Sequence, residues 1–353
     1  METTKLTQNS RGSGCGCKIA PDVLEKILKS TSTNAIDTKL LVGNTTKDDA
    51  AVYDLGNGTA LISTVDFFMP IVDDAFDFGR IAAANAISDV YAMGGKPLLA
   101  TAILGWPVEK LPAELAQQVI EGAKTICNKA GITLAGGHSI DSLEPMFGLS
   151  VNGLVELNHL KKNSTAKAGD LIYITKKIGV GILATALKRG VISSEHESVF
   201  ITQLTQLNSI GALFGKLDYV TAMTDITGFG LLGHLIEMME GGDLSAELNY
   251  EKVLLIEGIQ TYISKMIVPD NVYRNWNSYQ HKVKNIGAES FFTLCDPQTN
   301  GGLMVTISSN HKNEFEQFLK ENNLTEFASP VGRVIKKSEF CIIINHKIAD
   351  NNL

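Results

Sequence analysis

Two thiols and a lysine stand among glycines near the start of the chain, in the segment Gly-Ser-Gly-Cys-Gly-Cys-Lys at residues 12–18. Glycine offers neither core burial nor helix propensity, so the segment favours mobility and close approach of the backbone to a ligand. A disulfide between Cys15 and Cys17 would close a very small ring, which disulfide geometry disfavours. Lys18 beside them favours the thiolate, the reactive form of cysteine. A catalytic or substrate-carrying thiol is the favoured interpretation, and metal or redox binding and a chance cluster stay open.

One carboxylate stands in an unfavourable position. Asp89 follows an alanine-rich run and lies about one turn before Gly94 and Gly95, where a helix should end. A carboxylate near the C-terminus of a helix opposes the helix dipole by about 0.3–1 kcal/mol. Asn85 lies four residues earlier, on the same helix face. A bound cation would turn this penalty into an attraction, and a solvated aspartate that tolerates the dipole is the alternative.

Further carboxylates stand at the ends of expected strands. Asp48 and Asp49 precede one strand, Asp66 ends another, and Asp225 ends an apolar stretch. Asp225 could also cap a helix. Each is a weak signal alone, but together with Asp89 they indicate magnesium, which prefers hard oxygen ligands and usually bridges phosphates.

Two glycine-rich turns offer backbone amides to phosphate groups. Residues 135–139, Ala-Gly-Gly-His-Ser, follow a short expected strand, and residues 227–230, Thr-Gly-Phe-Gly, precede an expected helix. Bare glycine backbone and a helix N-terminus both donate to phosphate, although neither turn is a Walker loop or a dinucleotide fingerprint. His138 and His234 are more typical of structural than of catalytic histidines, but the glycine loop leaves His138 accessible.

Composition excludes several classes of protein. The 353 residues predict two domains, and their net charge of −7 argues against a general nucleic-acid binder. The first twenty residues lack an apolar signal core, and no apolar run reaches the length of a membrane span. Five cysteines without a framework spacing fit a reducing compartment, so we expect a cytoplasmic protein. Cys127, Cys295 and Cys341 are scattered and typical of small apolar residues.

Strands and helices alternate in both halves of the chain, which predicts mixed α/β or α+β layers. The polar stretch 161–170 predicts a domain boundary between the halves. In the first half we expect strands at 50–54, 60–65, 98–104, 133–135 and 147–155, with a hairpin turn at 56–58 and helices at 78–93 and 112–130. In the second half we expect strands at 171–174 and 302–307 and helices at 182–188 and 231–239.

Taken together, these motifs resemble the selenophosphate synthetase (selenide, water dikinase) family. The N-terminal thiol segment separates that family from relatives that share only the aspartate-rich nucleotide site. Asn300 departs from the family pattern, in which a serine is expected. The matches occur in the expected order along nearly the whole chain: Gly14-Cys15-Gly16-Cys17-Lys18, Val42-Gly43-Asn44, 48–53, Thr64-Val65-Asp66-Phe67-Phe68, 85–95, 135–139, 225–230 and Cys295-Asp296-Pro297-Gln298-Thr299.

The resemblance implies a two-domain fold like that of aminoimidazole ribonucleotide synthetase, with mixed sheets covered by helices. It implies a mobile catalytic segment at 1–20, an N-terminal domain at 21–160 that binds ATP and Mg²⁺ and forms a homodimer through its sheet, and an α+β domain at 170–345. The implied reaction converts selenide, ATP and water to selenophosphate, AMP and orthophosphate. Its product supplies activated selenium for selenoproteins and selenium-modified tRNA.

Carried over position by position, the resemblance also implies residue roles. Cys15 would be the catalytic thiol and Lys18 the catalytic cation, and Asp49, Asp89 and Asp225 would hold Mg²⁺. The residues that would contact ATP are Lys18, Thr46, Lys47, Asp48, Asp66 and Asp89, joined across the dimer by Gly137, His138 and Ser139.

Two alternatives stay open. The chain could be another ATP-using enzyme of the same fold, such as an aminoimidazole ribonucleotide or thiamine-phosphate enzyme, but the thiol segment argues against this. It could also be a thiol carrier that binds and delivers selenium or a metal without chemistry, and the intact aspartates argue against that. No nucleic acid and no membrane are expected as partners.

Overall fold

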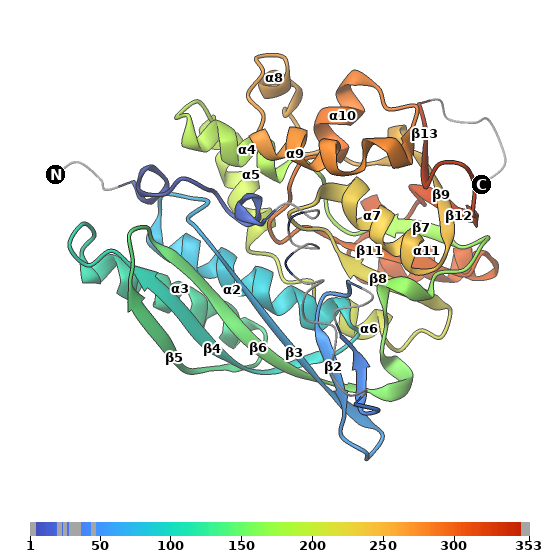
Figure 1. Cartoon of the computed structure of the whole chain (residues 1–353), viewed down its shortest axis with the longest axis horizontal. Coiled ribbons are helices and arrows are strands. Elements are labelled where there is room, and N and C mark those ends of the chain that lie inside the picture. The colour runs from blue at the N-terminus through green and yellow to red at the C-terminus, as the bar shows by residue number, and fades with distance from the viewer. Residues whose placement is uncertain (1–4, 20–22, 24–26, 28–36, 44–46, 347–353) are drawn as a thin grey trace.

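Two β-sheets, each with packed helices, form the body of the molecule (Figure 1). The computed structural model describes residues 5–19, 23, 27, 37–43 and 47–346. The first sheet is built from residues 40–156 and the second from residues 171–345, with a linker of short helical turns between them. In the part of the chain described, no helix is both long and apolar enough to cross a membrane.

The first sheet has six strands in the order β1-β2-β3-β6-β4-β5. All neighbours pair antiparallel except β4 and β5, and the predicted hairpin joins β2 to β3. Helices α2 (Ala75–Ala92) and α3 (Ala113–Lys129) pack together on one face. The strands are β1 (Leu40–Val42), β2 (Ala51–Asp54), β3 (Thr59–Phe68), β4 (Lys96–Trp106), β5 (Thr133–Asp141) and β6 (Met146–Glu156).

Helix α2 is buried along almost its whole length because it lies between the first sheet and the second domain. Asp74 caps its N-terminus by accepting from the backbone N–H of Asp77 at 2.7 Å. Gly122 of α3 allows close approach, since a Cβ there would lie 1.9 Å from the Phe76 carbonyl oxygen. The helix ends at Met93 and is followed by Gly94 in the left-handed region, as the Gly-Gly pair predicted. A small-residue helix at this position brings its polar side chains close to both domains.

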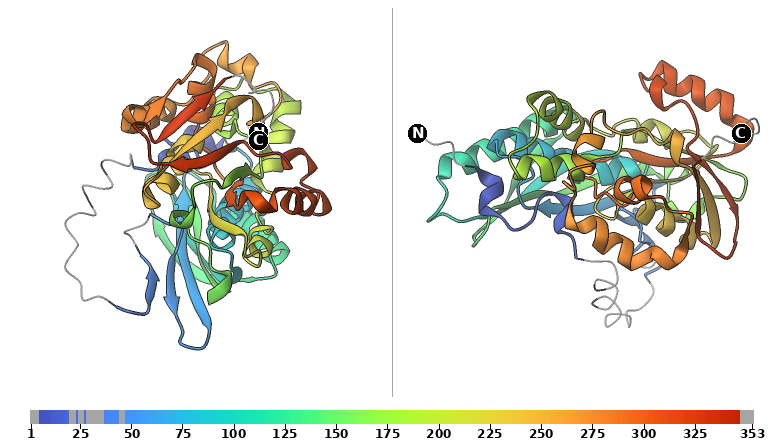
Figure 2. Two further views of the ribbon diagram at one scale, coloured as in Figure 1. Left: turned by 90° about the vertical axis from the view of Figure 1, so that its right-hand side faces the viewer. Right: turned by 90° about the horizontal axis from the view of Figure 1, so that it is seen from above.

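The opposite face of the first sheet is uncovered and apolar. Val65 and Phe67 of β3, Leu98 of β4 and Ile140 of β5 are each about half exposed. His138 lies on the same face. It pairs across the sheet with Ile103 of β4, Ile103 pairs with Gly148 of β6, and Gly148 pairs with Phe67. Among the described elements, no helix covers this face (Figures 1 and 2).

The second sheet has seven strands in the order β10-β13-β9-β12-β7-β11-β8, and helices cover both of its faces. Strand β7 (Leu171–Ile174) shows why, since Ile172 and Ile174 join one apolar core while Leu171 and Tyr173 join the other. The remaining strands are β8 (Val220–Asp225), β9 (Leu244–Asn249), β10 (Val283–Lys284), β11 (Leu303–Ile307), β12 (Gly332–Lys336) and β13 (Ile342–Asn345). The helices are α4 (Val180–Lys188), α5 (Ser194–Leu204), α6 (Gly211–Phe214), α7 (Gly230–Gly241), α8 (Gln260–Ile263), α9 (Asp270–Tyr279), α10 (Ala288–Leu294) and α11 (Lys312–Glu321).

Two expectations about glycine-rich segments are wrong. The strand expected at 133–135 continues through the Gly-Gly pair to Asp141, so His138 belongs to a strand and not to a loop. The segment expected to add little to a core does contribute to one, because Leu6 and Cys15 are buried within the apolar core of the first domain. In both cases tertiary contacts outweigh the low intrinsic preference of glycine for regular structure.

Candidate active site

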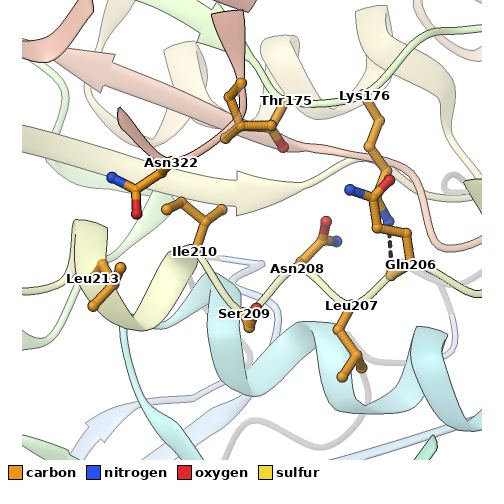
Figure 3. Close-up of a pocket in the computed structure, with 10 residues that line it drawn as sticks. Thr175, Lys176, Gln206, Leu207, Asn208, Ser209, Ile210, Leu213 and Asn322 are labelled. Carbon is orange, nitrogen blue, oxygen red and sulfur yellow. Dashed lines mark hydrogen bonds between the residues drawn. The ribbon is translucent and has the colours of Figure 1, made fainter. Parts of the chain in front are cut away.

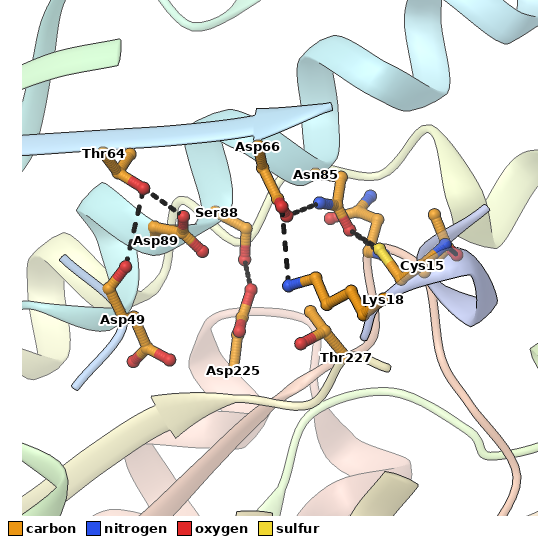
Figure 4. Close-up of polar contacts among 12 residues, drawn as sticks. Cys15, Lys18, Asp49, Thr64, Asp66, Asn85, Ser88, Asp89, Asp225 and Thr227 are labelled. Atoms are coloured by element: carbon orange, nitrogen blue, oxygen red, sulfur yellow. Dashed lines mark hydrogen bonds and ion pairs between the residues drawn. The ribbon is translucent and has the colours of Figure 1, made fainter. Parts of the chain in front are cut away.

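Three carboxylates from distant parts of the chain meet where the two domains join (Figure 4). Asp89 of α2 accepts a hydrogen bond from the Thr64 hydroxyl of β3. Asp225, at the end of β8, accepts from Ser88 Oγ of α2 at 2.6 Å, so it is not a helix cap. Asp49 accepts from the Thr224 hydroxyl at 2.8 Å.

The three carboxylates strongly disfavour one another's charge. Burial first, and the nearby charges of Asp225 and Asp89 second, raise the pKa of Asp49 well above its usual range. Burial and the Asp225 and Asp66 carboxylates do the same to the pKa of Asp89, and burial raises the pKa of Asp225. Oδ2 of Asp49 and Oδ1 of Asp225 are buried without a hydrogen-bond donor. Buried carboxylate oxygens of this kind are unfavourable unless a cation or a donor reaches them.

The thiol of Cys15 lies in a polar network next to these carboxylates. It donates to Asn85 Oδ1 at 3.3 Å, and the Asn85 amide donates to Asp66. Lys18 Nζ lies 3.4 Å from the other oxygen of Asp66. The Cys15 backbone N–H donates to Thr299 Oγ1 at 2.9 Å. The Cys15 side chain is only 1% exposed, and nothing is described of the Cys17 side chain.

Lys18 does favour the Cys15 thiolate, as expected, but two opposing effects are larger. Burial and the Asp66 carboxylate together raise the pKa of the Cys15 thiol, and they outweigh the opposite effect of Lys18. Partial burial lowers the pKa of the Lys18 ammonium, but Asp66, Cys15, Asp89 and Asp225 raise it by more. This arrangement therefore holds a neutral thiol and a charged lysine.

Only some of the other residues expected to contact the nucleotide lie near the carboxylates. Thr46 lies outside the described residues, Lys47 is exposed, and Asp48 accepts from the Asn163 backbone N–H at 2.7 Å. Lys47 and Asp48 immediately precede Asp49, and the Lys47 carbonyl accepts from the Asn163 side-chain amide at 2.9 Å. The structure does not bring Gly137, His138 and Ser139 to this site within one chain, because they lie on edge strand β5, and His138 faces the uncovered side of the sheet.

His234, in contrast, is a structural residue. It is buried, its Nε2 lies 3.2 Å from Thr227 Oγ1, and its Nδ1 lies 3.2 Å from Glu237. The hydroxyls of Thr64, Ser88, Thr224 and Thr299 were missed as site residues. Thr64, Ser88 and Thr299 stand within the matched motifs, but a hydroxyl near an aspartate in sequence carries no signal of its own.

The structure explains why asparagine suits position 300, where the family pattern has serine. Its backbone adopts a left-handed φ of 46°, which asparagine tolerates better than most residues. Its side-chain amide donates to the carbonyls of Leu204 and Gln206 at 2.7 and 2.9 Å. Its backbone N–H donates to Asn85 Oδ1 at 2.7 Å, so it helps to orient the partner of Cys15.

A cavity of about 230 Å³ is lined by residues 206–210 together with Thr175, Lys176 and Asn322 (Figure 3). Burial lowers the pKa of Lys176 in its wall to about 7, and the amino group donates to the carbonyls of Gln206 and Asn300. Asn208, also in the wall, donates to Ser88 Oγ at 2.8 Å, and Ser88 donates to Asp225. Asn208 thus both lines the cavity and orients the serine that donates to Asp225.

Comparison with known proteins identifies the family. Residues 47–155 match the AIR synthase related protein, N-terminal domain, and residues 167–345 match the AIR synthase related protein, C-terminal domain. The chain is 52% identical over 346 residues to "Selenide, water dikinase" of Haemophilus influenzae (strain 86-028NP), covering 98% of this chain and 99% of that protein. It is 52% identical over 335 residues to the protein of the same name from Colwellia psychrerythraea, covering 95% and 97%.

The chain belongs to the selenide, water dikinase family.

Solved structures confirm the two-domain fold expected for this family. One is "AaThiL complexed with AMPPCP and TMP", with a TM-score of 0.69, 18% identity, and coverage of 94% of this chain and 95% of that one. Another is the HypE–HypF complex, with a TM-score of 0.67, 18% identity, and coverage of 94% and 99%. At these identities the likeness concerns the fold alone. The selenide, water dikinase relatives, in contrast, are about 50% identical over 95–98% of this chain.

The carboxylate cluster generates a stability prediction. Asp89→Asn should raise the melting temperature of the metal-free protein at pH 7 by about 1–3 °C, because a buried charge and its repulsion are removed. The pKa of Asp89 is raised on folding, so the wild type loses stability as pH rises above about 4, where the unfolded chain begins to release this proton. The difference in melting temperature between Asp89→Asn and the wild type should therefore vanish in acid.

Scanning calorimetry from pH 4 to pH 8 measures this difference. Glu109→Gln makes the same chemical change at an exposed position and should shift the melting temperature at no pH. A melting temperature of Asp89→Asn that falls below that of wild type at pH 7 would contradict the prediction.

Proposed function

We propose that this chain makes selenophosphate from selenide, ATP and water and releases AMP and orthophosphate. The single observation that supports this best is that a buried thiol and a lysine, held by Asn85 and Asp66, lie beside the three carboxylates. Full-length relatives at about 50% identity carry the name of this activity. The product would supply activated selenium for selenoproteins and selenium-modified tRNA. We expect the protein to act in the cytoplasm.

In this proposal Asp49, Asp89 and Asp225 hold Mg²⁺. Two of their buried oxygens lack a donor, and hard carboxylate oxygens suit this ion, so the residues fit it. Bound Mg²⁺ would neutralise charge on the triphosphate and on the cluster. Among the residues described, no group of three or more His, Cys, Asp or Glu side chains is already arranged to hold a metal ion.

The nucleotide would lie along Thr46, Lys47, Asp48, Asp66 and Asp89. Lys18 would place its charge on the phosphoryl group that is transferred, and its pKa keeps it protonated at neutral pH. Phosphoryl transfer depends mainly on alignment and charge neutralisation, which these residues supply. Cys15 would hold or guide the selenium species, since sulfur is a soft, polarisable partner. The N-terminal segment that carries Cys15 would lie over the phosphates and exclude water.

The protein would act as a homodimer formed through the uncovered face of the first sheet. That face exposes apolar side chains of three strands, a feature typical of protein interfaces. His138 lies on the same face, so Gly137, His138 and Ser139 of a second copy would contact the nucleotide across the dimer. The N-terminal domain at 21–160 would thus bind ATP and Mg²⁺ and dimerise, while the domain at 170–345 supplies Asp225.

The reaction gives the first test. With ATP, Mg²⁺ and selenide, the purified protein should form AMP, orthophosphate and selenophosphate, and AMP formation should require selenide. Phosphorus NMR and anion-exchange chromatography measure the products. Formation of ADP alone, or AMP formation without selenide, would indicate another ATP-using enzyme of this fold, whereas selenide binding without turnover would indicate a carrier.

The thiols and the lysine give the second test. Cys15→Ser should form no selenophosphate, although its hydroxyl can still donate to Asn85 and keep the fold. Lys18→Gln should lower kcat by about 100-fold or more, because a neutral amide cannot stabilise the developing charge. Cys17→Ser should keep its activity, as should Cys341→Ser in the second domain. Equal loss in Cys15→Ser and Cys17→Ser, with release of a bound metal, would show ligation instead of chemistry.

The uncovered sheet face gives the third test. Analytical ultracentrifugation of the wild type should give twice the chain mass of 38.1 kDa. Phe67→Glu should give the monomer and lose ATP affinity, because it puts a charge in the interface. Val191→Glu, at a similarly exposed apolar position of the second domain, should remain dimeric. A wild-type monomer that binds ATP would refute the dimer proposal.

A further inference from the structure

Residues 5–19, here called the strap, run between the two domains and carry Cys15. Three contacts fix the strap to the first domain. Thr7 donates through its backbone and hydroxyl to Asp73, and the Arg11 N–H donates to Glu144 at 3.0 Å. Nearer the thiol, the Gly14 N–H donates to the Met69 carbonyl at 3.1 Å. These contacts leave the carbonyls of residues 10–12 to be satisfied from elsewhere.

One side chain of the second domain donates to all three carbonyls, and the Gly12 carbonyl also accepts from Ser10 Oγ at 3.0 Å. Lys188, the last residue of α4, donates from Nζ to the carbonyl oxygens of Ser10, Arg11 and Gly12 at 2.9, 3.2 and 3.0 Å. An ammonium group has three hydrogens, so its full donor capacity is used on the strap. Among the described residues no carboxylate forms an ion pair with Lys188. The charged amino group of Lys188 is therefore directed entirely at the strap.

The path from this contact to the thiol is short and tightly confined. Gly12 lies three residues before Cys15. Gly14 has a left-handed φ of 52°, and a Cβ there would lie 2.5 Å from Thr299 Oγ1 and 2.6 Å from Ile71. The same Thr299 hydroxyl accepts the Cys15 backbone N–H. Because only two residues separate Gly12 from Cys15 and the backbone between them is confined, we expect a displacement of the carbonyls at 10–12 to disturb the bond of Cys15 with Asn85.

We propose that Lys188 is a positioning residue for the reaction: by binding three consecutive carbonyls of the strap, it sets the position of the Cys15 thiol and makes that position depend on the second domain. Lys188 touches neither Cys15 nor the carboxylates. The effect on turnover rests on the proposed function, whereas the effect on the position of Cys15 does not.

The test compares Lys188→Met, which keeps the length of the apolar stem and removes all three donors, with Lys188→Arg, which keeps a cation and several donors. Alkylation of Cys15 by iodoacetamide, followed by mass spectrometry of the peptide, reports how often the buried thiol opens. We expect Lys188→Met to speed alkylation about tenfold or more, and Lys188→Arg to restore most of the protection. Lys337→Met, which removes an exposed lysine of the second domain, should match the wild type.

Two readouts separate positioning from general instability. Cys127 is fully buried in the first domain, and its alkylation should stay slow in every variant. In the selenide assay Lys188→Met should lower kcat with little change in the KM for ATP. Unchanged Cys15 alkylation in a folded Lys188→Met protein overturns the proposal, and so does equal acceleration at Cys127.

If Lys188→Met does not fold, Lys188→Gln, which keeps two neutral donors, takes its place, with intermediate acceleration expected and wild-type protection overturning the proposal. A wild type that makes no selenophosphate would refute the proposed function, while the alkylation rates would still test the role of Lys188.

Discussion

The unfavourable burial of three like charges is the constraint on which this site depends. Asp49, Asp89 and Asp225 come from a loop, a helix and a strand end, and only the junction of the two domains brings them together. Hydroxyl donors from Thr64, Ser88 and Thr224 offset part of the cost, but two carboxylate oxygens remain without a donor. The fold keeps this arrangement because α2 is held by apolar packing on the sheet and against the second domain. Core packing thus stabilises a polar cluster that would not form alone.

The Cys15 thiol lies beside the carboxylates in surroundings that oppose its reactivity. Cys15 is buried and neutral beside Asn85, whereas a reactive thiol must be accessible and ionised. Contacts from both domains hold the strap in this closed arrangement. The same burial that protects the thiol also brings Lys18 to Asp66, next to the expected path of the phosphates. The position of the strap therefore determines both the burial of the thiol and the placement of the lysine.

Other proteins share the two domains of this fold but are distant in sequence. The two domains and their sheets are shared with structures that are only about 18% identical, which shows that many sequences satisfy the packing. The selenide, water dikinase relatives match along the whole chain. What distinguishes the present site from an aspartate cluster alone is the strap, with its thiol, its lysine and the side chains that receive them. Asn300 belongs to this receiving surface, since it orients Asn85.

The sequence by itself predicted the alternating elements, the long alanine-rich helix with its Gly-Gly end, and Asp225 at a strand end, because these depend on local periodicity and turn chemistry, whereas Asp66 lies within β3 and not at its end. It also predicted that Asn85 and Asp89 share a face, which helix geometry alone requires. Only the tertiary structure decided that the glycine-rich strap is packed, that β5 runs through its glycines, and that Cys15 is a neutral, buried thiol. These outcomes depend on contacts between residues distant in sequence, such as Cys15 with Asn85 and Ile103 with His138, which no local pattern records.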